Sequence, residues 1–137
     1  MPHRIEARPF FDPGTEELRY LPECPRIFGN SLLWISIQYA ADQPRGGLNV
    51  LDLATGRNQH HRLPGRPGFF AETDDAGVIV IGLERRLVLY NLARAEITET
   101  LAILPDDDRV IINDGTAIPG GLIFGTSICN SARRGLS

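Results

Sequence analysis

Apolar and polar residues alternate along this chain in short segments that recur. Three segments have the same form, namely SLLWISI at 31–37, GVIVIGL at 77–83 and GLIFGTS at 121–127. Each is rich in β-branched or aromatic residues and follows a turn that contains glycine, which is typical of a β-strand. The segments start 46 and 44 residues apart. The chain therefore carries an internal repeat, which predicts a repeated unit of structure.

A second apolar segment follows each of the first two, GLNVLDLATGR at 47–57 and RLVLYNLARAE at 86–96. Further strands are expected around 58–63 and 97–103. The last of these is ambiguous, because Ala93, Ile97, Leu101 and Leu104 are spaced as on the apolar face of a helix. Its counterpart in the preceding repeat contains Gly56 and the polar run 57–61, which would make a poor helix. We therefore predict a strand.

The pattern predicts an all-β fold, a partial β-propeller. About four short strands that recur every roughly 40–50 residues are the signature of a propeller blade. The expected blades are 21–63, 67–104 and an incomplete one at 110–137. That makes about two and a half blades, whereas closed propellers usually have about four to eight. We interpret the whole chain, 1–137, as the N-terminal part of a propeller; a single β-sandwich is the structural alternative.

Composition narrows the class of protein. The 137 residues are 42% hydrophobic and 23% charged, which is typical of a folded domain. The net charge of −3 argues against a nucleic-acid partner, and no apolar stretch is long enough to span a membrane. Without a visible signal peptide, we expect a cytoplasmic protein. Cys24 and Cys129 are then interpreted as buried or idle thiols.

Two polar residues share one position of the repeat. Glu23 lies eight residues before Ser31, Asn113 lies eight before Gly121, and the middle repeat has Phe69 eight before Gly77. Equivalent positions on the innermost strands of a propeller converge on its central channel, so we expect the side chains of Glu23 and Asn113 to face each other there. A carboxylate and a carboxamide offer the hard oxygen ligands that Ca²⁺ prefers.

Three stretches resemble the senescence-marker-protein/gluconolactonase/regucalcin-like family. LPECPRIFGNSLLWISI at 21–37 is similar to the family's opening "EGP…LLWVDI" segment, and LPGRPGF precedes GLERRLVLYNL as in the family. The most specific stretch is INDGTAIPGGLIFGT at 112–126, which is similar to the "FNDG…DPxGRxWxGTM" signature. The resemblance covers about 21–126, less than half of a complete family domain.

This resemblance implies a six-bladed propeller that hydrolyses sugar lactones, or organophosphates in some relatives, with a divalent cation. Ca²⁺ is the expected ion, with Zn²⁺, Mn²⁺ or Mg²⁺ as alternatives. Glu23 would be a metal ligand, and Asn113 a metal ligand that also contacts substrate. The family's further asparagine and its aspartate, the candidate base, come from later blades, so no catalytic residue is expected in this chain.

The sequence also departs from the family pattern. Cys24 replaces the usual glycine after the glutamate, Ser36 replaces a common aspartate, and Ile111 stands where regucalcin-like members carry a substrate-binding arginine. Ile118 and the pair Gly121–Leu122 depart from "DPxGR". The change at Ile111 puts the sugar-acid specificity of those members in question and leaves the metal site untouched.

Other polar residues have simpler interpretations. His60 and His61 project to opposite faces of a strand and are expected at the surface. Residues 106–108 are expected in a solvated acidic loop, 113–115 would by themselves suggest a hairpin turn, and Trp34 is expected in the core between blades. The alternatives to a lactonase portion are a non-catalytic propeller-type binding or scaffold module and an inactive truncated product. An open sheet edge also predicts self-association.

Overall fold

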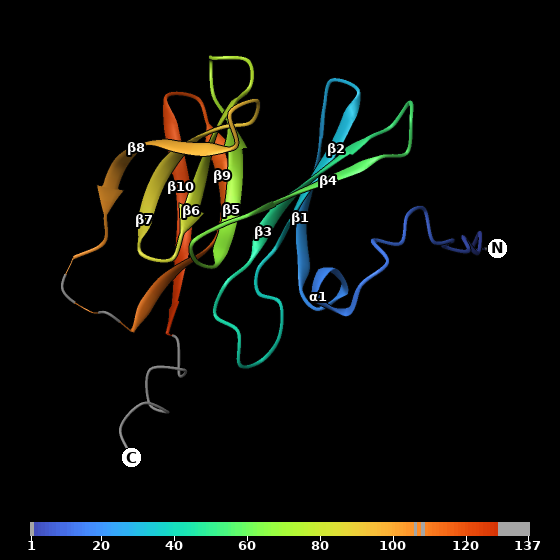
Figure 1. Ribbon diagram of the computed structural model, residues 1–137, viewed down its shortest axis with the longest axis horizontal. Helices are drawn as coiled ribbons and strands as arrows, with labels where there is room; N and C mark the ends of the chain where they lie inside the picture. Colours follow the sequence, from blue (N-terminus) through green and yellow to red (C-terminus); the bar gives the residue numbers. More distant parts are fainter. Residues whose placement is uncertain (1, 106, 108, 129–137) are drawn as a thin grey trace.

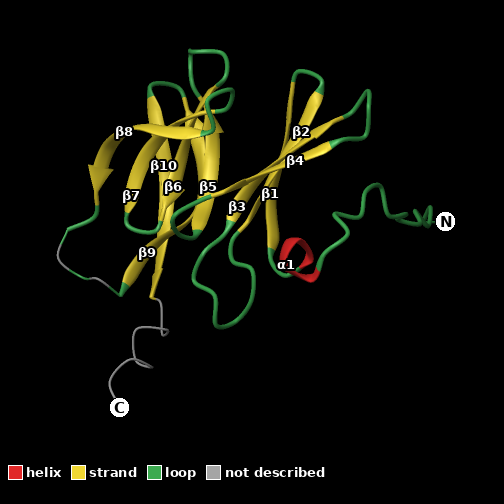
Figure 2. Ribbon diagram, in the orientation of Figure 1, coloured by secondary structure: helices red, strands yellow, loops and turns green. Residues whose placement is uncertain are grey.

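The computed structural model describes residues 2–105, 107 and 109–128, which form three antiparallel sheets (Figures 1 and 2). The first contains β1 (Pro22–Phe28), β2 (Ser31–Ser36), β3 (Gly47–Asp52) and β4 (Asn58–Arg62). The second contains β5 (Pro67–Glu72), β6 (Val78–Leu83), β7 (Arg86–Asn91) and β8 (Glu96–Ile103). The third contains β9 (Val110–Ile118) and β10 (Gly121–Ile128). One short helix, α1 (Glu16–Arg19), precedes β1.

Strand order within each sheet follows the chain, and the sheets pack face to face, as blades do. A core of ten buried residues, Leu33, Ile35, Leu48, Leu63, Phe70, Ile79, Ile81, Leu83, Val88 and Tyr90, joins the first sheet to the second. A smaller core of Phe69, Ala71, Val80 and Ile112 joins the second sheet to β9 and β10. The fold is thus all-β and corresponds to part of a β-propeller, as predicted.

The ambiguous segment is a strand. β8 pairs antiparallel with β7 from Arg86↔Ile103 to Asn91↔Glu96, with two register irregularities on the way. One of them lies between the pairs of Leu89 and Tyr90, after which Ile97 packs against the larger core. Pairing with β7 supplies hydrogen bonds along the whole segment, and this tertiary contact outweighs the local helical spacing.

Trp34 lies elsewhere than expected. It is buried, at 8% exposure, but alternation along β2 places Leu33 and Ile35 in the core between the sheets and Trp34 on the opposite face. There it makes an edge-to-face contact with Phe11 of the N-terminal segment, with ring centroids 5.7 Å apart. The expectation that Trp34 lies between blades is therefore wrong for the described chain.

The two histidines of β4 project to opposite faces, yet the expectation of surface positions is wrong. His61 is buried, at 5% exposure, and its Nδ1 lies 2.8 Å from the Tyr90 hydroxyl across the interface between the first two sheets. His60 is half-buried on the other face. The alternation argument gave the direction of each side chain correctly, but it could not show that both faces of this sheet are covered.

Candidate functional site

The backbone around Glu23 is irregular. Glu23 pairs with Ile35, and the register of β1 shifts between Glu23 and Arg26, as in a β-bulge. Cys24, inside the bulge, has φ +58°, a left-handed conformation that glycine adopts without strain. This conformation explains why glycine suits the position after the glutamate. Cys24 tolerates it while its half-buried Sγ lies 3.9 Å from the Phe70 carbonyl oxygen; Cys129 lies outside the described residues.

Asn113 lies inside β9, in a second bulge. Ile112 pairs with Thr126 and Gly115 with Phe124, so Asn113 and Asp114 lie together opposite one residue of β10. The hairpin turn comes later, between Ile118 and Gly121, which shows that the turn interpretation of 113–115 is wrong. The side chain of Asn113 is exposed to solvent.

The sheet register places the three repeat positions at one level. Glu23 pairs with the fifth residue of β2, Phe69 pairs with the fifth residue of β6, and Asn113 lies in the bulge opposite the fifth residue of β10. Glu23 and Asn113 are both exposed, whereas Phe69 is buried in the smaller core. That Glu23 and Asn113 face each other across a channel remains a prediction.

Close backbone contact positions β9. A Cβ added at Gly68 of β5 would lie 2.3 Å from the carbonyl oxygen of Ile112 and 2.4 Å from that of Asn113. Only glycine permits this approach of two strands. Gly68 therefore fixes the distance between β9 and β5, and with it the position of Asn113.

An ion pair that sequence reasoning missed supports the same region. Arg66 contacts both carboxylate oxygens of Glu84, with Nε 2.7 Å from Oε1 and Nη2 2.9 Å from Oε2. The Glu84 carbonyl accepts a hydrogen bond from Ile112 N at 2.6 Å, and Glu84 itself has φ +53° in the β6–β7 turn. The turn thus links the start of β5 to the start of β9. Opposite charges 18 residues apart give no local pattern that could have predicted this.

A polar network covers the outer face of the first sheet. Tyr39 Oη lies 2.6 Å from His60 Nε2, and His60 Nδ1 lies 2.9 Å from Asn49 Oδ1. Asn49 is fully buried, and its Nδ2 donates to Ser36 Oγ at 3.1 Å. Burial, with Arg62 and His61 nearby, lowers the pKa of His60 to about 4. The ring is then neutral and accepts from the tyrosine while donating to the asparagine. A polar Asn49 within an alternating strand was the available signal.

The donor set fits a hard cation only in part. Glu23 and Asn113 supply one carboxylate and one carboxamide oxygen, which suit Ca²⁺ chemically. Among the described residues, no three His, Cys, Asp or Glu side chains gather as a metal site would require. Ca²⁺ takes about six to eight oxygen ligands, so these two residues could form only one side of its shell. The acidic loop gives no further donor, since exposed Asp107 pairs with Arg109 at 2.8 Å and residues 106 and 108 lie outside the described part.

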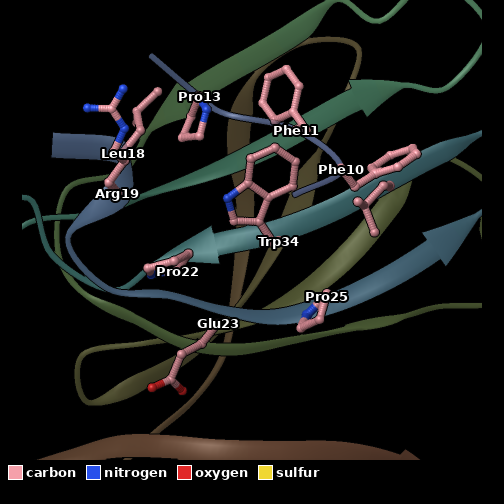
Figure 3. A pocket seen from close by; sticks show the side chains of 10 residues that line it. Phe10, Phe11, Pro13, Leu18, Arg19, Pro22, Glu23, Pro25 and Trp34 are labelled. Carbon is pink, nitrogen blue, oxygen red and sulfur yellow. The ribbon is translucent and has the colours of Figure 1, made fainter. Parts of the chain in front are cut away.

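Beside Glu23, on the outer face of β1 and β2, is a pocket of about 380 Å³ (Figure 3). Its walls are mostly apolar and come from the N-terminal segment and from the two strands; they include Phe10, Phe11, Leu18, Arg19 and Trp34. The carboxylate of Glu23 points away from the aromatic rings (Figure 3). No helix in the described part of the chain is long and apolar enough to cross a membrane.

Comparison with known proteins agrees with this geometry. The model of the SMP-30/gluconolactonase/LRE-like region matches residues 21–136. A search of curated proteins gives no match. Among solved structures, regucalcin from Agrobacterium tumefaciens strain C58, described as a calcium-binding protein, superposes with a TM-score of 0.67 at 27% identity. The match covers 82% of this chain and 37% of the regucalcin chain.

Proposed function

Because the chain belongs to the SMP-30/gluconolactonase/LRE-like family, we propose that it forms the N-terminal portion of a divalent-cation-dependent sugar-lactone hydrolase. Ca²⁺ is the proposed ion, since the regucalcin neighbour is described as calcium-binding and the two candidate ligands offer oxygen atoms. The chain spans 37% of the length of that neighbour, so it holds part of the site only. The two cysteines in 137 residues support the cytoplasmic location expected from the sequence.

The two residues have different roles in this proposal. The exposed carboxylate of Glu23 supplies negative charge at the cation, while the carboxamide oxygen of Asn113 supplies a neutral ligand. The amide N–H of Asn113 remains available to donate a hydrogen bond to a substrate oxygen. When bound, the cation would polarise the lactone carbonyl and stabilise negative charge on its oxygen. Neither residue is assigned the role of general base.

One observation carries the proposal. Within a family match over 21–136, the two exposed polar residues Glu23 and Asn113 occupy the same level of β1 and β9, and both lie at bulges. Bulges commonly re-aim side chains beside active sites. Gly68 and the Arg66–Glu84 pair hold β9 in place, so Asn113 is on a supported strand.

Calorimetric titration of the 137-residue chain with Ca²⁺ tests the ligand assignment. We expect binding at about the millimolar end of protein Ca²⁺ sites, because one carboxylate and one amide leave most of the shell to water. Glu23→Gln and Asn113→Ala should each weaken this binding further. Glu99→Gln, which removes an exposed carboxylate on β8, is the matched control and should bind as the unchanged chain does.

Hydrolysis of gluconolactone is the second readout. We expect turnover no faster than the uncatalysed background, since the family's aspartate has no counterpart here. Micromolar Ca²⁺ affinity with turnover that depends on Glu23 would show that the chain completes its own site and would overturn the partial-site proposal. Identical Ca²⁺ binding by Glu23→Gln, Asn113→Ala and the Glu99 control would remove the ligand assignment and favour a non-catalytic binding module.

A further inference from the structure

The pocket on the outer face of β1 and β2 has an aromatic lining. Trp34 lies on its floor, with Phe11 edge-to-face at 5.7 Å, and Phe10 lies beside them (Figure 3). Phe10 is 78% exposed, so its ring is free to contact a ligand. The negative faces of aromatic rings attract cations within about 6 Å of the ring centre.

The charged groups around this pocket sum to a negative value. Arg19 is the cation of the lining, and Asp12 takes up its guanidinium with contacts of 2.9 and 3.1 Å. Glu16 contacts the same guanidinium at 3.3 Å, and Glu23 adds a carboxylate with no ion pair among the described residues. Three carboxylates against one guanidinium leave a net charge of −2.

We propose that this pocket binds a small quaternary ammonium compound. The methyl groups of such a cation suit the apolar walls, and its charge is attracted both by the rings and by the net negative surroundings. An anionic ligand is disfavoured, because the donors of Arg19 are already committed to Asp12 and Glu16. The inference is independent of the lactonase proposal, since it uses the outer face of the first sheet and no metal.

The pocket carries its own reporter. Trp34 is the sole tryptophan of the chain, so its fluorescence reports on this pocket and on nothing else. Titration with choline chloride, against sodium chloride at equal ionic strength, should give a saturable change with half-saturation in the millimolar range. Dimethylbutanol, the uncharged carbon isostere of choline, should bind at least about tenfold more weakly if the positive charge is recognised.

Substitutions locate the binding. Phe10→Leu keeps an apolar side chain at an exposed position and should raise the half-saturation concentration about threefold, the size expected for an exposed cation–π contact. Tyr20→Leu removes an exposed aromatic ring that does not line the pocket, and should leave the titration unchanged. An absent saturable response, equal binding of dimethylbutanol, or equal titrations of Phe10→Leu and the unchanged chain would each overturn the proposal.

Discussion

Cys24 shows how one residue reconciles backbone and packing. Its φ of +58° is costly for any residue with a Cβ, by about 1–2 kcal/mol, yet its side chain packs against both cores. The bulge that needs this conformation also holds Glu23. Backbone strain here therefore lies next to a proposed ligand, a common position for it.

A pair of substitutions at Cys24 separates the two effects. Cys24→Ala and Cys24→Gly both remove Sγ, but only glycine relieves the left-handed backbone. We expect the glycine variant to be more stable than the alanine variant by about 1 kcal/mol in urea unfolding. At Ala117, an exposed strand position of β9, Ala→Gly should lower stability by about 0.5–1 kcal/mol. A loss of equal sign at both sites would contradict the strain assigned to Cys24.

His60 makes stability depend on pH. Its folded-state pKa is about 4 and its ordinary value is 6.5, chiefly because burial disfavours the charged ring. The unfolded chain therefore binds more protons between these values, so stability is full above pH 6.5 and falls as the pH drops to about 4. Burial lowers the pKa of His61 as well, which acts in the same direction.

Urea midpoints measured from about pH 7 to about pH 4 test this dependence. His60→Gln should flatten the decline, because the glutamine side chain does not titrate. His3→Gln, at an exposed histidine in the N-terminal segment, should keep the full decline. Equal slopes for the two variants would show that the network around His60 is not the source.

At the scale of elements, the strands could be predicted and their surroundings could not. Alternation and the repeat identified the strand of 97–103 and the faces of His60 and His61, because pleating fixes side-chain direction locally. Burial depends on what covers each face, and the N-terminal segment covers Trp34 through Phe11, a contact no repeat predicts. The bulges at Glu23 and Asn113 and the Arg66–Glu84 pair also depend on distant strands. The level shared by Glu23 and Asn113 could be found, but not the direction of their side chains.

The contact between β5 and β9 gives a prediction for elements. Gly68→Ala would force a Cβ against the backbone of Ile112 and Asn113, which cannot yield as a side chain can. We expect a loss of about 2 kcal/mol in urea unfolding. Gly121→Ala has open space around its Cβ and should change stability by less than about 0.5 kcal/mol. Equal effects at the two glycines would show that β9 shifts freely relative to β5.

At the scale of the whole molecule, the outer edges of the three sheets differ in charge. β4 carries Arg62, and β8 carries Glu96 and Glu99, which discourage pairing with another chain. β10 contains neither a charged residue nor proline, and its far edge is unpaired within the described residues. Ile123 on this strand is 59% exposed. The β10 edge is therefore the one we expect to associate.

Sedimentation of the 137-residue chain over a range of concentrations tests this expectation. We expect concentration-dependent association that Ile123→Lys weakens at least about tenfold, because a lysine on an edge strand opposes pairing. Ile103→Lys, at a 69% exposed position of β8, introduces the same charge elsewhere and should associate like the unchanged chain. A monomer at every concentration, or equal effects of the two lysines, would exclude the β10 edge as the contact.

The unequal cores have a consequence for the order in which the molecule comes apart. Ten buried residues hold the first two sheets together, whereas four hold β9 and β10 to the second sheet. Local opening free energies follow the amount of apolar contact that must be broken. Amide hydrogens of β9 and β10 should therefore exchange with solvent faster than those of β2 and β6. The molecule would lose the strand of Asn113 while that of Glu23 is still folded, so the two halves of the proposed site would disappear in separate steps.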